Sequence, residues 1–204
     1  MRYLLVGAGE FAPEKFNRQV DDIVIAVDKG FDFLLGKADF AIGDFDSLGY
    51  IPQVENVKVL PAHKDYTDMN MALEYVVEQV ARNHQTQPIV CIFGALGGRL
   101  DHTISNIQLG YDYSKRGLDV RLIGAREQIV FVSDKLVLAK KDCGVVSNFA
   151  LDSCAIVSLD GFAYPLSNAT LTNRFPLGQS NEIVSDLATI SVSKGTIMVI
   201  INDK

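Results

Sequence analysis

Short apolar runs alternate with amphipathic stretches over the first 125 residues of the chain. This alternation is typical of a parallel β-sheet with both faces covered. The apolar runs predict six strands, at residues 3–6, 23–27, 40–42, 57–60, 89–93 and 120–123. We therefore expect residues 1–125 to form an N-terminal α/β domain.

Two stretches between the predicted strands have helical periodicity. Apolar side chains at positions 69, 73, 76, 77 and 80 fall on one face of a helix, and Thr67 just before them is the expected N-cap. A second helix is expected over about residues 101–116. It would turn Ile104, Ile107 and Tyr111 inward, and Gly117 would follow it in the C′ position, which favours a left-handed backbone.

The pattern changes from about Gln128, where β-branched residues alternate with polar ones between Gly, Asn and Pro. Strands are expected at residues 155–159, 188–192 and 196–201. Lys194 and Gly195 lie between the last two runs and predict a hairpin turn. Residues 126–204 are therefore expected to form a small all-β, sandwich-like domain.

Composition and charge narrow the class of protein. The chain has 204 residues, of which 48% are hydrophobic and 22% charged, as in globular proteins. Its net charge of −6 disfavours nucleic acid or an anionic membrane as a main partner. No apolar run approaches the roughly 20 residues that span a bilayer, and residues 3–9 are typical of a strand rather than a secretory signal. The three cysteines form no CxxC pair, so we expect free thiols, no zinc site and a cytoplasmic location.

The first candidate for chemistry is the segment Gly43-Asp44-Phe45-Asp46-Ser47, which directly follows the predicted strand 40–42. In an extended segment, Asp44 and Asp46 point to the same side and can share a cation. Ligands of a parallel sheet bind in the crevice beyond the carboxyl ends of its strands, where this segment lies. The alternative is a turn in which each Asp caps local N–H groups.

A second acidic segment, Lys64-Asp65-Tyr66-Thr67-Asp68, lies at the start of the first predicted helix. Carboxylates are common there because they cap N–H donors and oppose the helix dipole. Two acidic clusters at consecutive strand ends repel each other unless a cation lies between them. Mg²⁺ suits such a place, because it binds a few carboxylates, water molecules and substrate phosphates.

The third candidate runs from Gly94 through Gly97, Gly98 and Arg99 to His102, after the predicted strand 89–93 and at the start of the second helix. Glycines permit close approach to a phosphate, a helix N-terminus attracts anions, and Arg99 can bind phosphate oxygens bidentately. The segment predicts a phosphate cradle that is not a Walker A loop. His102 is a candidate to donate to a phosphate of the nucleotide or to orient Asp101. Alternatively, the glycines only form a tight turn and Arg99 only pairs with Asp101.

A competing pattern follows the first predicted strand. Residues 7–12, Gly-Ala-Gly-Glu-Phe-Ala, fit the loose dinucleotide motif G-x-G-x-x-A, and Asp28 ends the second strand where a ribose-binding acid belongs. This pattern favours an NAD-type oxidoreductase. It leaves the two acidic segments unexplained.

Taken together, GDFDS, KDYTDMNMAL and GGRLDH, in this order and ahead of a β-rich tail, resemble the motifs of thiamine pyrophosphokinases. The tail adds GFAYPL at residues 161–166 and GQSNE at residues 178–182, which are similar to the GLKYPL and GxSNE segments of that family. The resemblance covers the chain from Asp28 to the C-terminal strands. It departs from the family pattern at Lys29, where a glycine is usual, and at residues 162–163, where Leu-Lys is usual.

The resemblance implies Mg²⁺-dependent transfer of the pyrophosphoryl group from ATP to the hydroxyl of thiamine, with release of AMP. It places the metal ligands at Asp44, Asp46 and Asp68, with Asp65 nearby. It places the nucleotide contacts around Asp28, Gly30, Ser47, Lys64, Thr67 and Arg99. In such a site the metal and Arg99 would neutralise the phosphate oxygens in the transition state. Asp65 or Asp101 would accept the hydroxyl proton, and the sequence does not choose between them.

The resemblance also implies a homodimer, with thiamine held between the catalytic domain of one subunit and the β-domain of the other. Tyr164, Ser180 and Asn181 would then face thiamine, and Asp101 would meet it from the catalytic side. A sensor that binds thiamine or a nucleotide without turnover is the remaining alternative. The complete set of carboxylates argues against it.

Overall fold

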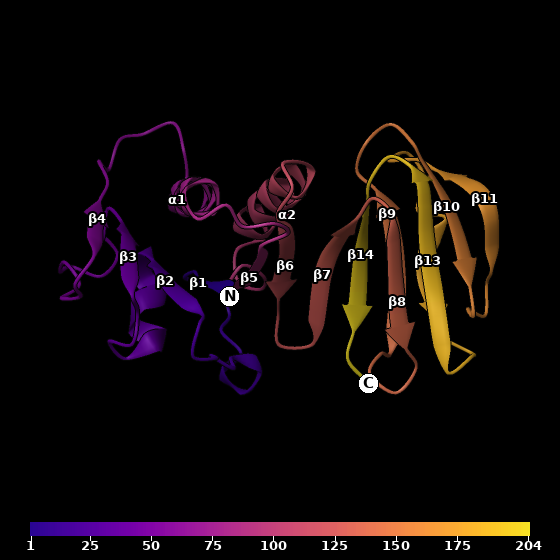
Figure 1. The fold of residues 1–204 in the computed structure, drawn as a ribbon, viewed down its shortest axis with the longest axis horizontal. Helices are drawn as coiled ribbons and strands as arrows, with labels where there is room; N and C mark the ends of the chain where they lie inside the picture. Colours follow the sequence, from indigo (N-terminus) through magenta and orange to yellow (C-terminus); the bar gives the residue numbers. More distant parts are fainter. The chain divides into compact units, whose positions relative to one another are not determined.

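The structure is a computed structural model that describes residues 1–204 (Figure 1). The chain divides into two compact units, Met1–Ala125 and Arg126–Lys204. The first is α/β with a parallel sheet and the second is all-β, which confirms the expected fold class. None of the helices has the length and apolar character needed to cross a membrane.

The first unit contains a six-stranded parallel sheet with the strand order β4-β3-β2-β1-β5-β6. Its strands are β1 (Arg2–Val6), β2 (Ile23–Val27), β3 (Phe40–Gly43), β4 (Val57–Val59), β5 (Ile89–Phe93) and β6 (Asp119–Ile123). Each begins and ends within one residue of its prediction. Because β1 pairs with both β2 and β5, the chain order reverses at β1. Open parallel sheets bind their ligands at the carboxyl ends of the strands beside such a reversal.

Both faces of this sheet are buried, as its apolar runs predict. Leu4 and Val6 belong to a core cluster with Phe31 of the 3-10 helix η2 (Asp28–Leu34). Tyr3 and Leu5 alternate with them along β1, point to the opposite face and are 0% exposed. The helices α1 (Asp68–Arg82) and α2 (Leu100–Lys115) lie on the same side of the sheet (Figure 1).

The helix boundaries agree with those predicted from the sequence, but the side chains that α2 buries differ from the predicted ones. Thr67 caps α1 by accepting a hydrogen bond from the Asn70 N–H at 3.1 Å, and Gly117 follows α2 with φ +96°. The prediction that Ile104 faces inward was wrong, since it is 49% exposed. The buried residues of α2, Gly110 and Tyr113, are in its second half. Its first half carries no buried residue because it borders the cavity described below.

A polar network joins the two α-helices through the buried Tyr113. Its hydroxyl donates to Glu74 Oε1 at 2.6 Å and accepts from Asn70 Nδ2 at 3.1 Å. Arg116 donates to the same Glu74 carboxylate at 2.6 Å. The N-terminal turn of α1, which contains Asn70, is thereby tied to α2.

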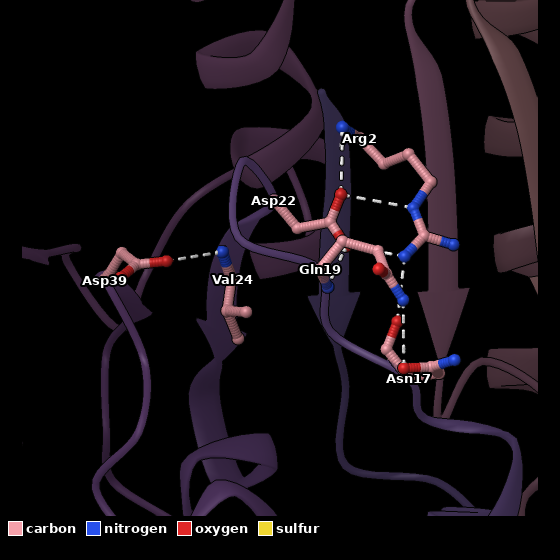
Figure 2. A network of polar contacts seen from close by, with 6 residues as sticks. All are labelled: Arg2, Asn17, Gln19, Asp22, Val24 and Asp39. Atoms are coloured by element: carbon pink, nitrogen blue, oxygen red, sulfur yellow. Dashed lines mark hydrogen bonds and ion pairs between the residues drawn. The ribbon is translucent and has the colours of Figure 1, made fainter.

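A second network closes the amino edge of the sheet (Figure 2). The buried Asp22 accepts hydrogen bonds from the Arg2 N–H at 3.2 Å, Arg2 Nε at 3.1 Å and the Gln19 N–H at 2.8 Å. Asp39 accepts from the Val24 N–H at 2.8 Å. These carboxylates fix the starts of β1 and β2, so polar groups at this edge are used for structure.

The second unit consists of two antiparallel sheets around one apolar core. One has the order β12-β9-β14-β7 and the other the order β11-β10-β13-β8. The strands are β7 (Glu127–Val132), β8 (Lys135–Ala139), β9 (Val145–Ala150), β10 (Ala155–Asp160), β11 (Leu166–Leu171), β12 (Gly178–Glu182), β13 (Leu187–Lys194) and β14 (Ile197–Asn202). The three strands expected here are present.

The turn at Lys194 and Gly195 is not the predicted hairpin. Strand β13 pairs with β10 and β8, whereas β14 pairs with β7 and β9, so this turn carries the chain from one sheet to the other. Both strands bury apolar side chains, Ile190 and Val199, in the same core cluster, which sequence alternation cannot distinguish from pairing. Gly195 has φ +82°, and a Cβ there would lie 2.9 Å from the Cys154 carbonyl oxygen.

Candidate active site

A cavity of about 760 Å³ opens at the carboxyl edge of the α/β sheet. Its walls come from the loops after β1 and β5, from the end of β2, and from the first turns of α1 and α2. These walls include Gly7, Gly9, Glu10, Asp28, Thr67, Asp68, Gly97, Gly98, Arg99, Asp101, His102 and Asn106. The cavity thus lies beside the strand-order reversal. It contains residues of two of the three segments predicted at this edge, 64–68 and 94–102, and none of Gly43–Ser47.

The glycines after β1 serve packing between two loops. The N–H groups of Gly7 and Gly9 donate to the carbonyls of Phe93 and Gly94 at 2.8 and 2.9 Å. A Cβ on Gly9 would lie 2.5 Å from the Gly94 oxygen. Only the three-residue 3-10 helix η1 (Pro13–Lys15) follows, so the motif lacks both free donors and the helix that a dinucleotide-binding turn needs.

Of the glycines after β5, Gly98 is open, whereas a Cβ on Gly97 would lie 2.6 Å from Glu10 Oε2. Gly97 and Gly98 have φ +75° and +65°, and a Cβ on Gly98 would meet no atom within 4 Å. Asn106 of α2 holds this loop by donating to the Ala95 carbonyl at 2.9 Å. Arg99 is the N-cap of α2 but makes no side-chain capping hydrogen bond. The His102 N–H is bound by Asp101, whereas the N–H groups of Leu100 and Asp101 stay available to an anion.

Arg99 pairs with Asp101 in the structure. Its Nε and Nη2 donate to Oδ1 and Oδ2 of Asp101 at 3.1 and 2.6 Å, and the His102 N–H donates to Oδ1 at 3.0 Å. The Arg99 guanidinium holds the pKa of Asp101 below its usual value. Both side chains are mostly exposed, so Arg99 can turn toward an anion without movement of the backbone.

Three carboxylates gather at the ends of β2 and β3. Asp28, Asp44 and Asp46 each place one oxygen within 4.8 Å of the others. The segment after β3 is a turn rather than the expected extended chain: Phe45 has φ +57° and is buried, and the Asp46 N–H donates to Asp44 Oδ1 at 3.3 Å. The buried phenyl ring anchors the turn, and the turn brings the two flanking carboxylates together.

Asp28 reaches this cluster because Gly43 lets two strand ends approach. A Cβ on Gly43 would lie 3.0 Å from the Asp28 Cα, and Asp28 itself has φ +48°. Ser47 Oγ donates to Asp28 Oδ2, while Asp28 Oδ1 is buried and has no hydrogen-bond partner. An unpartnered oxygen beside two further carboxylates is the hard donor set that suits Mg²⁺ or Ca²⁺.

Lys64 connects this cluster to α1. Its Nζ lies 2.9 Å from Asp44 Oδ2 and 3.0 Å from Asp68 Oδ1. The hydrogen bond from Lys64 holds the pKa of Asp44 below its usual value. Burial raises the pKa of Asp68, and the charges of Asp44 and Asp28 raise it further. Asp65 is exposed beside this group.

In the β unit, Tyr164, Ser180 and Asn181 lie close together. Tyr164 is 70% exposed, whereas Asn181 is 3% exposed and its amide binds the backbone of Tyr164. A register shift between β12 and β9 leaves Ser180 with φ +58°, and its N–H donates to Ser147 Oγ at 3.0 Å. Such a bulge re-aims side chains, and here it leaves Ser180 exposed.

Two features of the site were missed from the sequence. Asp28 was expected to contact a nucleotide, and its place in the carboxylate cluster was not predicted. Its position at the end of β2, the strand adjacent to β3, could have indicated it. Gly30, expected as a nucleotide contact, has a packing role that the sequence did not indicate: it is buried, and a Cβ there would lie 1.9 Å from the Val6 oxygen. Its absent side chain lets η2 pack against β1.

Comparisons with known proteins agree on one family. Residues 17–122 match the family model "Thiamin pyrophosphokinase, catalytic domain", and residues 135–197 match "Thiamin pyrophosphokinase, vitamin B1 binding domain". The chain is 35% identical to a thiamine pyrophosphokinase of Bacillus subtilis over 189 residues, which are 86% of this chain and 85% of the relative.

Solved structures give the same result. A crystal structure of the Bacillus subtilis thiamine pyrophosphokinase has a TM-score of 0.84 at 30% identity, with all of both chains covered. The structure of a thiamin pyrophosphokinase from Geobacillus thermodenitrificans has a TM-score of 0.82 at 30% identity, covering 100% of this chain and 98% of the other. None of these matches supports a dinucleotide-binding oxidoreductase.

Proposed function

The chain belongs to the thiamine pyrophosphokinase family, and we propose that the cavity of its α/β unit binds ATP together with Mg²⁺. The protein is a thiamine diphosphokinase whose substrates are ATP and thiamine. The observation that carries the proposed site is the meeting of a cavity of about 760 Å³, a glycine loop that is open at Gly98 and a carboxylate cluster at one sheet edge.

The reaction makes one bond and breaks another. The hydroxyl oxygen of thiamine bonds to the β-phosphorus of ATP, and the bond between that phosphorus and the oxygen bridging to the α-phosphorus breaks. AMP leaves with the bridging oxygen, and the hydroxyl loses its proton. The transition state is loose, so the protein contributes mainly by positioning the groups and stabilising charge.

We propose Asp44, Asp46 and Asp68 as metal ligands, as the family resemblance implies. The buried and unpartnered oxygen of Asp28 supports this residue as a further ligand. Bound there, Mg²⁺ supplies positive charge to the phosphate oxygens. The turn at Phe45 and the start of α1 hold these carboxylates in place.

We propose that the phosphates bind at Gly97, Gly98 and the N-terminus of α2. Arg99 leaves Asp101 to bind phosphate oxygens, and His102 donates to the same group. The remaining proposed nucleotide contacts are Asp28, Gly30, Ser47, Lys64 and Thr67. Asp28 and Thr67 line the cavity, and Gly30, Ser47 and Lys64 are proposed from the family resemblance.

Two carboxylates remain as acceptors of the hydroxyl proton, Asp65 and Asp101. The ion pair with Arg99 lowers the pKa of Asp101 and makes it a weaker base while the pair persists. If Arg99 turns to the phosphates, Asp101 regains basicity. The proton therefore passes to whichever of these groups faces the hydroxyl in the complex.

For thiamine we propose Tyr164 and Ser180 as direct contacts, with Asn181 acting through Tyr164 and Asp101 meeting thiamine from the catalytic side. The enzyme would work as a homodimer in which the β-domain of one subunit faces the catalytic domain of the other. Free cysteines support a cytoplasmic location.

The test is a product assay. Incubation with ATP, Mg²⁺ and thiamine should yield AMP and thiamine diphosphate in equal amounts, and EDTA should abolish the reaction. Formation of ADP and thiamine monophosphate would refute pyrophosphoryl transfer. Binding of both substrates without turnover would make the protein a sensor.

A further inference from the structure

The Lys64 ammonium is held by two carboxylates and one backbone carbonyl of the protein. Lys64 Nζ lies 2.9 Å from Asp44 Oδ2, 3.0 Å from Asp68 Oδ1 and 3.2 Å from the Pro61 carbonyl oxygen. Lys64 donates hydrogen bonds to Asp44 and to the Pro61 carbonyl, and it pairs with Asp68 through charge, because Asp68 Oδ1 is buried and accepts no hydrogen bond. The side chain is 13% exposed, and this arrangement is therefore a largely enclosed site for one positive charge.

We propose that Lys64 is a built-in cation that holds Asp44 and Asp68 together before the metal binds, and that it must leave Asp44 when Mg²⁺ arrives. This inference rests on the proposed metal site. It makes Lys64 a positioning residue for the metal ligands, with a different set of partners in the loaded enzyme.

The charges around Lys64 explain why such a cation is needed. Asp28, Asp44 and Asp46 place carboxylate oxygens within 4.8 Å of one another, and Asp68 is close enough that Asp28 and Asp44 disfavour its charged form. Lys64 is the basic side chain that pairs with this group. Without it, like charges would face each other across the gap between β3 and α1, where partial burial strengthens the repulsion.

The same geometry sets the order of binding. Free Mg²⁺ must compete with Lys64 for Asp44. It brings no phosphate oxygen that could accept a hydrogen bond from the displaced ammonium. Mg²⁺ that arrives on ATP brings phosphate oxygens. These oxygens accept hydrogen bonds from the ammonium of Lys64 once it has left Asp44. The long flexible side chain of lysine allows this exchange without movement of the backbone. The enzyme therefore favours the metal–nucleotide complex over the free ion.

The experiment measures metal binding and stability without nucleotide. Lys64→Met keeps the length of the side chain and removes its charge. In EDTA this variant should have a lower melting temperature than wild type, and saturating Mg²⁺ should restore most of the loss. Free Mn²⁺, followed by electron paramagnetic resonance, should bind the variant about tenfold or more tightly than wild type, because a competing charge is gone.

Three further variants test whether the effects of Lys64→Met come from the loss of its charge. Lys64→Arg retains the charge and should keep a melting temperature in EDTA near that of wild type. Adding Asp68→Asn to Lys64→Met removes the repulsion and should recover stability without metal. Lys37→Met changes an exposed lysine outside the site and should leave both measurements unchanged.

Three results would overturn the inference. If wild type binds free Mn²⁺ and Lys64→Met binds it with the same affinity or more weakly, Lys64 does not compete with the metal. If neither protein binds Mn²⁺ even with a non-hydrolysable ATP analogue, the proposed metal site itself fails, and the inference fails with it. A loss of stability in Lys64→Met that Mg²⁺ does not restore would likewise exclude the place-holding role.

Discussion

The side-chain amide of Asn181 exchanges two hydrogen bonds with the backbone of Tyr164. The Tyr164 N–H donates to Asn181 Oδ1 at 3.0 Å, and Asn181 Nδ2 donates to the Tyr164 carbonyl at 2.8 Å. The amide thus pairs with Tyr164 as a neighbouring strand would. It fixes the backbone of a residue whose ring is 70% exposed.

Asn181→Ala should weaken thiamine binding through Tyr164. The substitution leaves the N–H and carbonyl of Tyr164 without partners, which costs about 1–3 kcal/mol of folding free energy where such groups stay buried. We expect a higher KM for thiamine, an unchanged KM for ATP and a lower melting temperature. Ser167→Ala, at an exposed position of β11, is the matched control and should change none of these. An unchanged thiamine KM in a destabilised Asn181 variant would limit Asn181 to a structural role.

Tyr164→Ala tests the ring itself. A cationic thiazolium against the face of a tyrosine gains about 0.5–2 kcal/mol from cation–π attraction, so thiamine binding should fall by up to some tens of fold. Tyr164→Phe keeps the aromatic face and should retain most of the affinity. ATP affinity, measured by calorimetry, should be the same in both variants. Equal thiamine affinity in Tyr164→Ala and wild type would place Tyr164 outside the site.

The sequence predicts local structure well here because apolar periodicity is a property of neighbouring residues. All six strands of the α/β unit and the N-cap Thr67 follow from it. Prediction from periodicity fails where contacts between residues distant in the sequence decide which strands pair. The turn at Gly195 connects two different sheets, because both strands around it bury one face in a shared core.

The candidate site shows the same limit. The motifs placed Asp44, Asp46 and Asp68 at one sheet edge, and the structure brings the first two together. The approach of Asp28 to this group depends on contact between two strand ends at Gly43, which no spacing in the sequence encodes. The bridge through Lys64 likewise depends on how a loop folds back onto β3.

Asp46→Asn separates catalysis from stability. Asp46 is an exposed member of the carboxylate cluster, so its charge adds repulsion that folding must overcome without metal. We expect a loss of kcat of about 100-fold or more, comparable to removal of a key electrostatic group. The melting temperature in EDTA should stay the same or rise. Asp21→Asn, at an exposed site on the amino edge, is the control, and near-normal turnover in the Asp46 variant would remove this residue from the metal site.

The ion pair between Glu74 and Arg116 makes stability depend on acid pH. Hydrogen bonds from Arg116 and Tyr113 hold the pKa of Glu74 below its usual value of 4.5. A carboxylate with a lowered pKa stabilises the fold above its ordinary pKa, and this stability is lost as pH falls through the folded value.

Thermal unfolding of Glu74→Gln should therefore differ most from wild type near neutral pH. The difference should shrink as pH falls below about 4.5, where Glu74 of the unfolded chain takes up a proton, and it should be lost once pH passes the lowered pKa of the folded state. Glu78→Gln on the same helix is the control: its pair with Arg82 spans 3.8 Å on the surface and should contribute little. A difference between Glu74→Gln and wild type that is constant with pH would show that charge is not the cause.

Mixing two impaired variants tests whether the site is shared between subunits. If Arg99 of one subunit and Tyr164 of the other serve the same site, a heterodimer of Arg99→Ala and Tyr164→Ala contains one intact site and one with both changes. Equal mixing at low thiamine should then restore up to about a quarter of wild-type activity, because half of the dimers are mixed and each carries one intact site of two. Differently tagged subunits, recovered together by tandem affinity purification, provide the measure of exchange. No recovery of activity in verified heterodimers would place both residues in the site of one chain, or Tyr164 outside it.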